Sequence, residues 1–156
     1  MFLPKGRTLG LAFFLLFASL SGVRSQENPA GATGIVDPLS FVGLTLDELI
    51  RGFGTPRSVY AARGLEEWQD DVVFVYDQGD FYVYKDRVWQ VGLRAVRGIK
   101  AGDTRGVVSL VLGSRAENRG SSLVCSLDGG SWPLELRCDF DREGRVQLIY
   151  IYRTDF

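Results

Sequence analysis

The second half of this chain repeats the plan of its first half, and this repeat is the strongest constraint on its fold. Three positions around each predicted helix match at a constant offset of 59 residues: Gly43 with Gly102, Thr45 with Thr104, and Gly54 with Gly113. Two more matches follow, Arg87-Val88 with Arg145-Val146 at an offset of 58, and residues 77–81 with 128–132 at an offset of 51. The offsets differ as loop lengths differ, which is how repeats diverge. Two tandem units are therefore predicted, residues 41–97 and 98–156, with chance similarity between two helix-plus-hairpin segments as the alternative.

Each predicted unit begins with a short helix. Thr45 and Glu48 have the spacing of a capping box, in which each side chain satisfies a free backbone amide of the other residue. Apolar residues recur from Leu46 at the spacing of one helical face, and Gly54 and Pro56 then end the helix.

After each helix the apolar period changes to two, which is typical of strands. The expected elements are a second helix at 104–112 and strands at 72–76, 81–84, 88–93, 134–140 and 146–152. In the last hairpin, the even-numbered residues from Leu134 to Tyr152 are expected to share the core face. The fold class is thus α+β, with two units that each contain a short helical segment and a three-stranded antiparallel meander. Together they would form a helix-on-sheet layer with a concave sheet face.

The N-terminal residues have the pattern of a secretory signal. Lys5 and Arg7 precede an apolar run over residues 9–20, and small side chains stand at positions −3 and −1 before a cleavage after Ser25. A membrane anchor is the alternative, but this run is too short to cross about 30 Å of hydrocarbon. The sequence therefore predicts a signal peptide at residues 1–25 and a periplasmic or secreted protein with no membrane span after cleavage.

The composition of the exported part excludes some partners. Residues 26–40 are rich in Gly, Ala, Pro and Asn and are expected to be a flexible leader. Without Lys5, Arg7 and Arg24, the 18 basic residues become 15 against 19 acidic residues, a net charge of about −4. This balance argues against a nucleic-acid partner.

The only two cysteines, Cys125 and Cys138, lie on the arms of one predicted hairpin. A pairing register whose residue numbers sum to 263 would place them opposite each other, where they could form a disulfide in an oxidising compartment. A register that sums to 259 would place Cys125 opposite Leu134 and keep the sulfurs apart. Two small core residues are therefore the alternative to a disulfide.

The residue types in this chain exclude several kinds of catalysis. There is no histidine, so a Ser-His-Asp or Cys-His hydrolase cannot be built. The acidic cluster Glu66, Glu67, Asp70 and Asp71 lacks the spacing of an EF-hand loop. We therefore expect no metal, no cofactor and no enzymatic activity. A histidine-free enzyme that uses carboxylates such as Asp70, Asp71 or Asp77 is an alternative.

Aromatic residues are the strongest functional signal. One sheet face under two short helices cannot bury all of them, and Tyr and Trp carry much of the binding energy at interfaces. Tyr82 and Tyr84 alternate with Phe81 and Val83, so they are the first candidates for an exposed strip. The further protein-binding candidates are Trp89, Trp68 and Trp132. Partial burial in the core is the alternative for each.

Two motifs resemble a known family. Residues 43–50, Gly-Leu-Thr-Leu-Asp-Glu-Leu-Ile, with Phe-Gly-Thr-Pro at 53–56, are similar to the opening of SmpA/OmlA (BamE) domains and of β-lactamase-inhibitor-protein-like domains. Residues 138–146 resemble a hairpin element near the end of such domains. The resemblance implies helical segments on an antiparallel sheet and, in the inhibitor protein, two units whose concave sheet grips a protein. Unlike BamE proteins, this chain has no lipobox cysteine.

These observations favour an exported, non-enzymatic protein-binding module of the cell envelope that acts as an assembly accessory or in an inhibitor-like role. Its partner would be another envelope or secreted protein, bound through an aromatic sheet face. A small-ligand or cell-wall binding module that uses the same aromatics is the second hypothesis.

Overall fold

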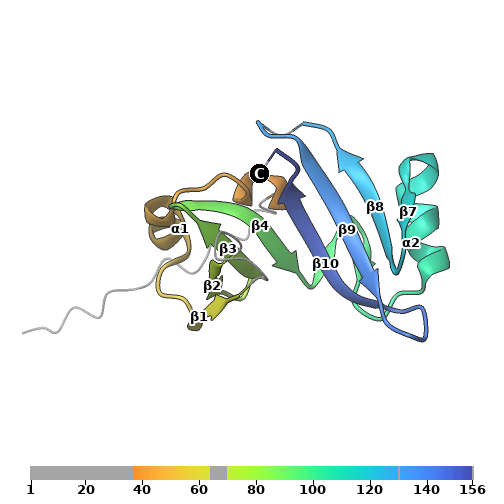
Figure 1. Cartoon of the computed structure of the whole chain (residues 1–156), viewed down its shortest axis with the longest axis horizontal. Helices are drawn as coiled ribbons and strands as arrows, with labels where there is room; N and C mark the ends of the chain where they lie inside the picture. Colours follow the sequence, from red (N-terminus) through yellow and green to blue (C-terminus); the bar gives the residue numbers. More distant parts are fainter. Residues whose placement is uncertain (1–36, 64–69, 130, 156) are drawn as a thin grey trace, which may run out of the picture. The chain divides into compact units, whose positions relative to one another are not determined.

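The computed structural model describes residues 37–63, 70–129 and 131–155, which form two short helices, one large antiparallel sheet and one small two-stranded sheet (Figure 1). These residues belong to one unit, Ile35–Phe156. The helices are α1 (Leu46–Phe53) and α2 (Arg105–Leu112), with short 3-10 turns η1 (Pro38–Phe41) and η3 (Gly113–Arg115). The α+β class predicted from the sequence is confirmed. The predicted signal peptide and residues 26–36 lie outside the described residues.

The main sheet has eight strands in the order β1-β2-β3-β4-β10-β9-β8-β7, and every neighbouring pair is antiparallel. Its strands are β1 (Ser58–Ala62), β2 (Asp71–Val75), β3 (Asp80–Tyr84), β4 (Arg87–Leu93), β7 (Glu117–Arg119), β8 (Ser122–Leu127), β9 (Leu134–Phe140) and β10 (Val146–Arg153). A separate two-stranded sheet contains β5 (Ala95–Val96) and β6 (Ile99–Lys100). Figure 1 shows α1 beside the β1–β4 half of the main sheet and α2 beside β7 and β8.

The sequence predicted α1 well. The Thr45 side chain accepts a hydrogen bond from the Glu48 amide, and the Glu48 carboxylate accepts one from the Thr45 amide at 2.8 Å. These bonds hold the pKa of Glu48 below its usual range. The chain leaves the helix at Gly54, whose φ of 77° favours glycine. Capping and the apolar stripe together therefore fix the position of this helix.

Four strands of the main sheet follow each helix, where a three-stranded meander was expected. The two additional strands are β1 and β7, at the opposite edges of the sheet. β7 is Glu-Asn-Arg, which has neither the β-branched residues nor the alternation that marks a strand. In β1, four of the five residues are exposed, and apolar and polar residues do not alternate regularly. Edge strands bury little apolar side-chain surface, so the apolar alternation by which strands are predicted is weak in their sequences.

Structure also begins earlier than expected. Asp37 and Pro38, which the sequence placed in the flexible leader, start the turn η1. The Asp37 side chain accepts a hydrogen bond from the Leu39 amide, and Phe41 at the end of the turn is buried in the core. A cap and one buried aromatic ring therefore order this segment.

One apolar core runs through the whole unit on the helix side of the sheet. A single row of directly opposite residues crosses this side of the sheet, Val59, Phe74, Phe81, Val91, Ile151, Leu136 and Cys125. The fully buried helix residues Leu49 and Val108 belong to the same core. β4 and β10 lie side by side at the centre, where Val91 pairs with Ile151.

A β-bulge near the start of β10 overturns one expectation. Val146 pairs with Phe140 and Leu148 with Asp139, so Gln147 is an extra residue on this strand. One extra residue moves every following side chain to the other face. Ile149 and Ile151 are therefore buried in the core, and Leu148, Tyr150 and Tyr152, which were expected in the core, lie on the opposite face.

A matched pair of glycines tests how tightly the two halves of the chain pack. Gly43 and Gly102 both have positive φ, +97° and +86°. A β-carbon at Gly43 would overlap the indole nitrogen of Trp132, whereas one at Gly102 would meet nothing within 4 Å. The Gly102→Ala change should cost about 1–2 kcal/mol of unfolding free energy from backbone strain alone. Gly43→Ala should cost about 1–3 kcal/mol more, because the ring must move. Urea unfolding of both variants would contradict this packing if their losses were equal.

Candidate functional site

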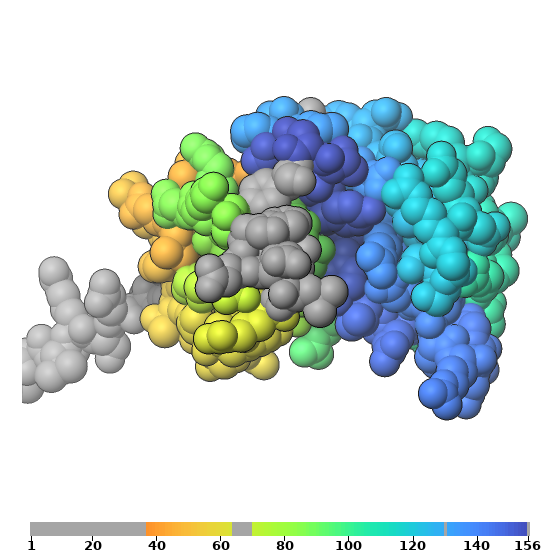
Figure 2. All heavy atoms as spheres, in the orientation of Figure 1, coloured from red at the N-terminus to blue at the C-terminus, as the bar shows by residue number. Residues whose placement is uncertain are grey.

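The sheet face opposite the helices carries a continuous row of directly paired residues that reaches from the edge strand β1 to β8, which lies next to the other edge strand. We call this face the open face and define it by that row, Tyr60, Val73, Tyr82, Gln90, Tyr152, Glu135 and Ser126. Two of its residues are not accessible, since Val73 is fully buried and Glu135 is 9% exposed. The buried residues of α1 and α2 belong to the core on the opposite side, so neither helix covers the open face. In the space-filling view, the atoms of β1 (yellow) lie at the lower left, and those of β9 and β10 (blue) lie from the centre to the right (Figure 2).

The β1–β4 half of the open face is aromatic. Tyr82 is half-buried and its ring makes an edge contact with the ring of Tyr150, with centroids 6.2 Å apart. Burial raises the pKa of Tyr82, and the adjacent Tyr150 and Tyr60 raise it further. Burial also raises the pKa of Tyr150. Both phenols are therefore neutral at physiological pH and offer a ring and a hydroxyl group to a partner.

Trp89 joins this aromatic group through a second bulge. Tyr82 pairs with Gln90 and Val83 with Val88, so Trp89 is the extra residue on β4. Its indole nitrogen donates a hydrogen bond to the Asp71 carboxylate at 2.8 Å. Burial raises the pKa of Asp71, and the Trp89 hydrogen bond opposes that rise. The bond fixes a half-buried indole beside the Tyr82 row.

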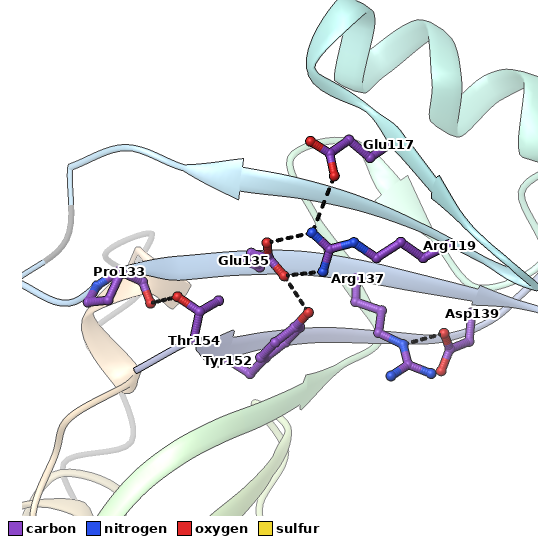
Figure 3. Close-up of polar contacts among 8 residues, drawn as sticks. All are labelled: Glu117, Arg119, Pro133, Glu135, Arg137, Asp139, Tyr152 and Thr154. Carbon is purple, nitrogen blue, oxygen red and sulfur yellow. Dashed lines mark hydrogen bonds and ion pairs between the residues drawn. The ribbon is translucent and has the colours of Figure 1, made fainter. Parts of the chain in front are cut away.

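The β7–β10 half of the open face is polar and preorganised (Figure 3). The Arg119 guanidinium donates to both oxygens of the Glu135 carboxylate, at 3.0 and 3.1 Å, and to Glu117 at 3.2 Å. The Tyr152 hydroxyl donates to the same Glu135 carboxylate. Burial and this hydrogen bond raise the pKa of Tyr152 to about 12. Glu135 is 9% exposed, so these bonds satisfy a nearly buried charge.

A second ion pair lies next to this network. Arg137 donates to the Asp139 carboxylate at 2.7 Å, and the Ser122 hydroxyl donates to the same oxygen. Asp139 raises the pKa of Arg137 through that hydrogen bond. Arg137 lies directly opposite Tyr150 on the neighbouring strand, so this pair borders the aromatic half of the face.

The structure brings some of the predicted site residues together and separates others. Tyr82 and Trp89 lie on the open face, and Tyr84 is half-buried at the end of β3 with the Lys85 ammonium 5.0 Å from its ring centroid. Trp132 does not belong to this group: it packs against the core, with the Arg153 guanidinium 3.8 Å from its ring centroid. Trp68 lies outside the described residues.

Sequence reasoning missed Tyr150, Tyr152 and Tyr60 as open-face residues. The first two were assigned to the core because no pattern around Gln147 announces a bulge. Tyr60 was missed with its strand. One sequence relation does connect the two bulges, since Trp89 and Gln147 stand at the same offset of 58 as Arg87 and Arg145.

Both cysteines are free thiols buried on the helix side of the sheet. Cys125 pairs with Leu136 and Cys138 with Leu123, a register that sums to 261 and lies between the two considered from the sequence. Diagonal neighbours in a sheet are about 7–8 Å apart, beyond the usual reach of a disulfide. The candidate disulfide is therefore not formed. Burial raises the pKa of the Cys138 thiol to about 11, and Asp139 adds to the rise.

The carboxylates considered for catalysis or calcium do not converge in the described part of the chain. Asp71 is bonded to Trp89, and Asp77 forms an ion pair with Arg57 in the turn before β3. Glu66 and Glu67 lie outside the described residues. Among the residues that the structure describes, no group of three or more acidic or cysteine side chains could hold a metal ion. In the same residues, no helix is long and apolar enough to span a bilayer.

The sequence matches no known family model and no curated protein. The fold is similar to that of an extracellular protein containing an SCP domain from Bacillus anthracis str. Ames, with a TM-score of 0.50 and 12% identity over 83% of this chain and 50% of that chain. A cysteine-rich secretory protein from Staphylococcus aureus subsp. aureus Mu50 gives a TM-score of 0.46 and 13% identity, over 74% of this chain and 46% of that chain. This chain thus spans about half the length of each. At 12% identity the likeness concerns the fold alone.

The family resemblance drawn from the sequence is corrected by this comparison, because the similar fold with a TM-score of 0.50 belongs to a protein that contains an SCP domain and not to a BamE-like or β-lactamase-inhibitor-like protein. The motif residues have local explanations. Thr45, Glu48 and Gly54 cap α1, and the Asp141 side chain accepts hydrogen bonds from the Glu143 and Arg145 amides in the last turn. Short helices and tight hairpins select such residues in unrelated proteins.

The polar network predicts unequal effects for two glutamates bonded to one arginine. Glu135→Gln should lower the unfolding free energy by about 1.5–3 kcal/mol, because a nearly buried carboxylate loses charged hydrogen bonds. The control Glu117→Gln should cost at most about 1 kcal/mol, since the Glu117 side chain is 69% exposed. Denaturant unfolding of both variants measures the difference, and similar losses would show that Glu135 does not organise the network.

The thiols give a direct test of the β8–β9 register. In the native protein at pH 8, an aromatic disulfide reagent should label neither Cys125 nor Cys138 within minutes, because both are buried and the pKa of Cys138 is high. In denaturant without reductant both thiols should react at once. Absence of thiols in the denatured protein would mean a disulfide and would contradict this register.

Proposed function

We propose that this chain is an exported, non-enzymatic binding protein that holds another envelope or secreted protein on the open face. The observation that carries the proposal is the row of paired residues across that face, in which Tyr60, Tyr82 and Tyr152 stand at intervals on strands that no helix covers. Half-buried aromatics on a rigid sheet lose little conformational entropy when a partner binds.

The two halves of the open face supply different parts of an interface. The aromatic half around Tyr82, Trp89 and Tyr150 provides apolar area with polar tips, as in the energetic centre of many protein interfaces. The polar half around Arg119 and Glu135 provides charges that are already oriented by their own hydrogen bonds. Oriented charges give specificity more than affinity. A protein surface with a matching apolar centre and polar border fits this arrangement.

Export and the absence of catalysis are part of the same proposal. The N-terminal pattern up to Ser25 is that of a signal peptide, and the SCP-domain protein with a similar fold is described as extracellular. A chain without histidine lacks the commonest general base, and the described carboxylates Asp71 and Asp77 are engaged with Trp89 and Arg57.

The proposal extends to the origin of the sheet from two tandem units, residues 41–97 and 98–156. Equivalent backbone bridges and side-chain hydrogen bonds support it. Thr45 bridges to Arg87 and Thr104 to Arg145, and the Gly43 and Gly102 carbonyls each accept a hydrogen bond from those arginines. The element orders α1-β1-β2-β3-β4 and α2-β7-β8-β9-β10 correspond, and each unit ends in a strand bulged at the same relative position.

Cross-linking in the native envelope tests the binding proposal. Tagged wild-type protein should capture one or a few proteins, with cross-links on β2, β3 and β10. The variant Tyr82→Ala/Tyr150→Ala should lose that capture. A matched control is Leu110→Ala/Val111→Ala on α2, whose side chains are exposed on the other side of the sheet, and this control should capture normally. Equal capture by both variants would contradict the proposal, as would co-purification of cell-wall fragments or small molecules alone.

A further inference from the structure

The two edges of the main sheet differ in how they are protected. β7, at one edge, has three residues, and two of them are charged. Arg119 is held by Glu117 and Glu135, and Asn118 accepts a hydrogen bond from Arg105 at 2.8 Å. Short, charged edge strands prevent pairing with other chains. This edge is closed to further strands.

β1, at the other edge, has none of these protections. Its five residues are Ser-Val-Tyr-Ala-Ala, with no charge and no proline, and all but Ala62 are exposed. It pairs with β2 on one side and is the last strand in the order. An uncharged, exposed edge strand is a template for an added strand from another polypeptide.

Apolar surface next to this edge is also left uncovered. Val59 on β1 is 50% exposed and Val72 on β2 is 43% exposed. Val59 pairs with Phe74 and Ala61 with Val72, so these side chains lie on the same side of the sheet. Apolar side chains on an added strand would bury Val59 directly and extend the apolar surface that Ala61 and Val72 form.

The charged residues at the two ends of β1 determine which kind of added strand this edge can bind. Arg57 and Arg63 directly flank β1, and extending its alternation by one residue at each end places them on the same side as Val59 and Ala61. In the register that pairs all of β1 with a second copy, Arg57 of each copy would face Arg63 of the other, and like charges directly opposite are destabilising. The ion pair of Arg57 with Asp77 is exposed, so a partner carboxylate can compete for it at little cost.

We infer that β1 is a docking edge for an extended segment of another protein, in which two acidic residues six positions apart flank apolar residues at alternate positions between them. The acidic residues would face Arg57 and Arg63, and the apolar residues would cover Val59 and Ala61. Backbone hydrogen bonds would add this segment to the sheet as a ninth strand. The segment would add at the backbone edge of β1 and cover its helix-side residues, whereas the open face lies on the other side of the sheet and includes only Tyr60 of this strand. The inference therefore stands without the proposed function.

The test is a titration of isotope-labelled protein, beginning at Gln26, with two synthetic peptides, followed by amide NMR shifts. The peptide Asp-Thr-Val-Thr-Val-Thr-Asp should shift the amides of Ser58–Ala62 and leave those of Glu117–Arg119 unchanged. The peptide Lys-Thr-Val-Thr-Val-Thr-Lys should bind at least about ten-fold more weakly, which corresponds to about 1.4 kcal/mol.

A charge-reversed protein provides the matched control. Arg57 and Arg63 are exposed, so Arg57→Glu/Arg63→Glu should keep the fold and reverse the preference between the two peptides. The inference would be overturned if neither peptide shifted β1, if both bound the wild-type protein equally, or if the reversed variant kept the original preference. Dimerisation of the free protein through β1, measured by sedimentation, would also overturn it.

Discussion

The pairing of β4 with β10 is the interaction on which the rest of the structure depends. Without it, β4 and β10 would each be an exposed edge strand, and their core side chains on the helix side of the sheet would lose their neighbours. Val91 and Ile151, paired at this seam, are both fully buried. Because the seam joins the two halves, residues of α1 and α2 belong to one core, and the open face continues from β1 to β7.

The two bulges beside this seam connect the fold to the proposed function. Each sits near the start of a central strand, at Trp89 in β4 and Gln147 in β10. Without the bulge at Gln147, Tyr150 and Tyr152 would face the core, and Ile149 and Ile151 would face solvent. The same feature therefore builds the core and places tyrosines beside Tyr82 and Glu135 on the open face.

Much of this fold follows from local sequence signals. The capping box of Thr45 and Glu48, the alternation of Phe81 and Val83 in β3, and the apolar face of β9 were predicted and are confirmed. The features that could not be predicted from the sequence depend on pairing between distant segments. The β8–β9 register, the bulge at Gln147 and the burial of Trp132 against Gly43 each result from tertiary contacts, and local patterns do not encode them. The short motifs drawn into a family resemblance were likewise capping and turn signals.

The measurement that tests this account most directly is native-state hydrogen exchange of the protein, resolved by residue. If the seam unites both halves in one cooperative unit, the slowest amides on β3, β4, β9 and β10 should exchange with a single free energy equal to that of global unfolding. Two distinct free energies, one for β1–β4 and another for β7–β10, would contradict the account. The open face would then be two separate surfaces and not one.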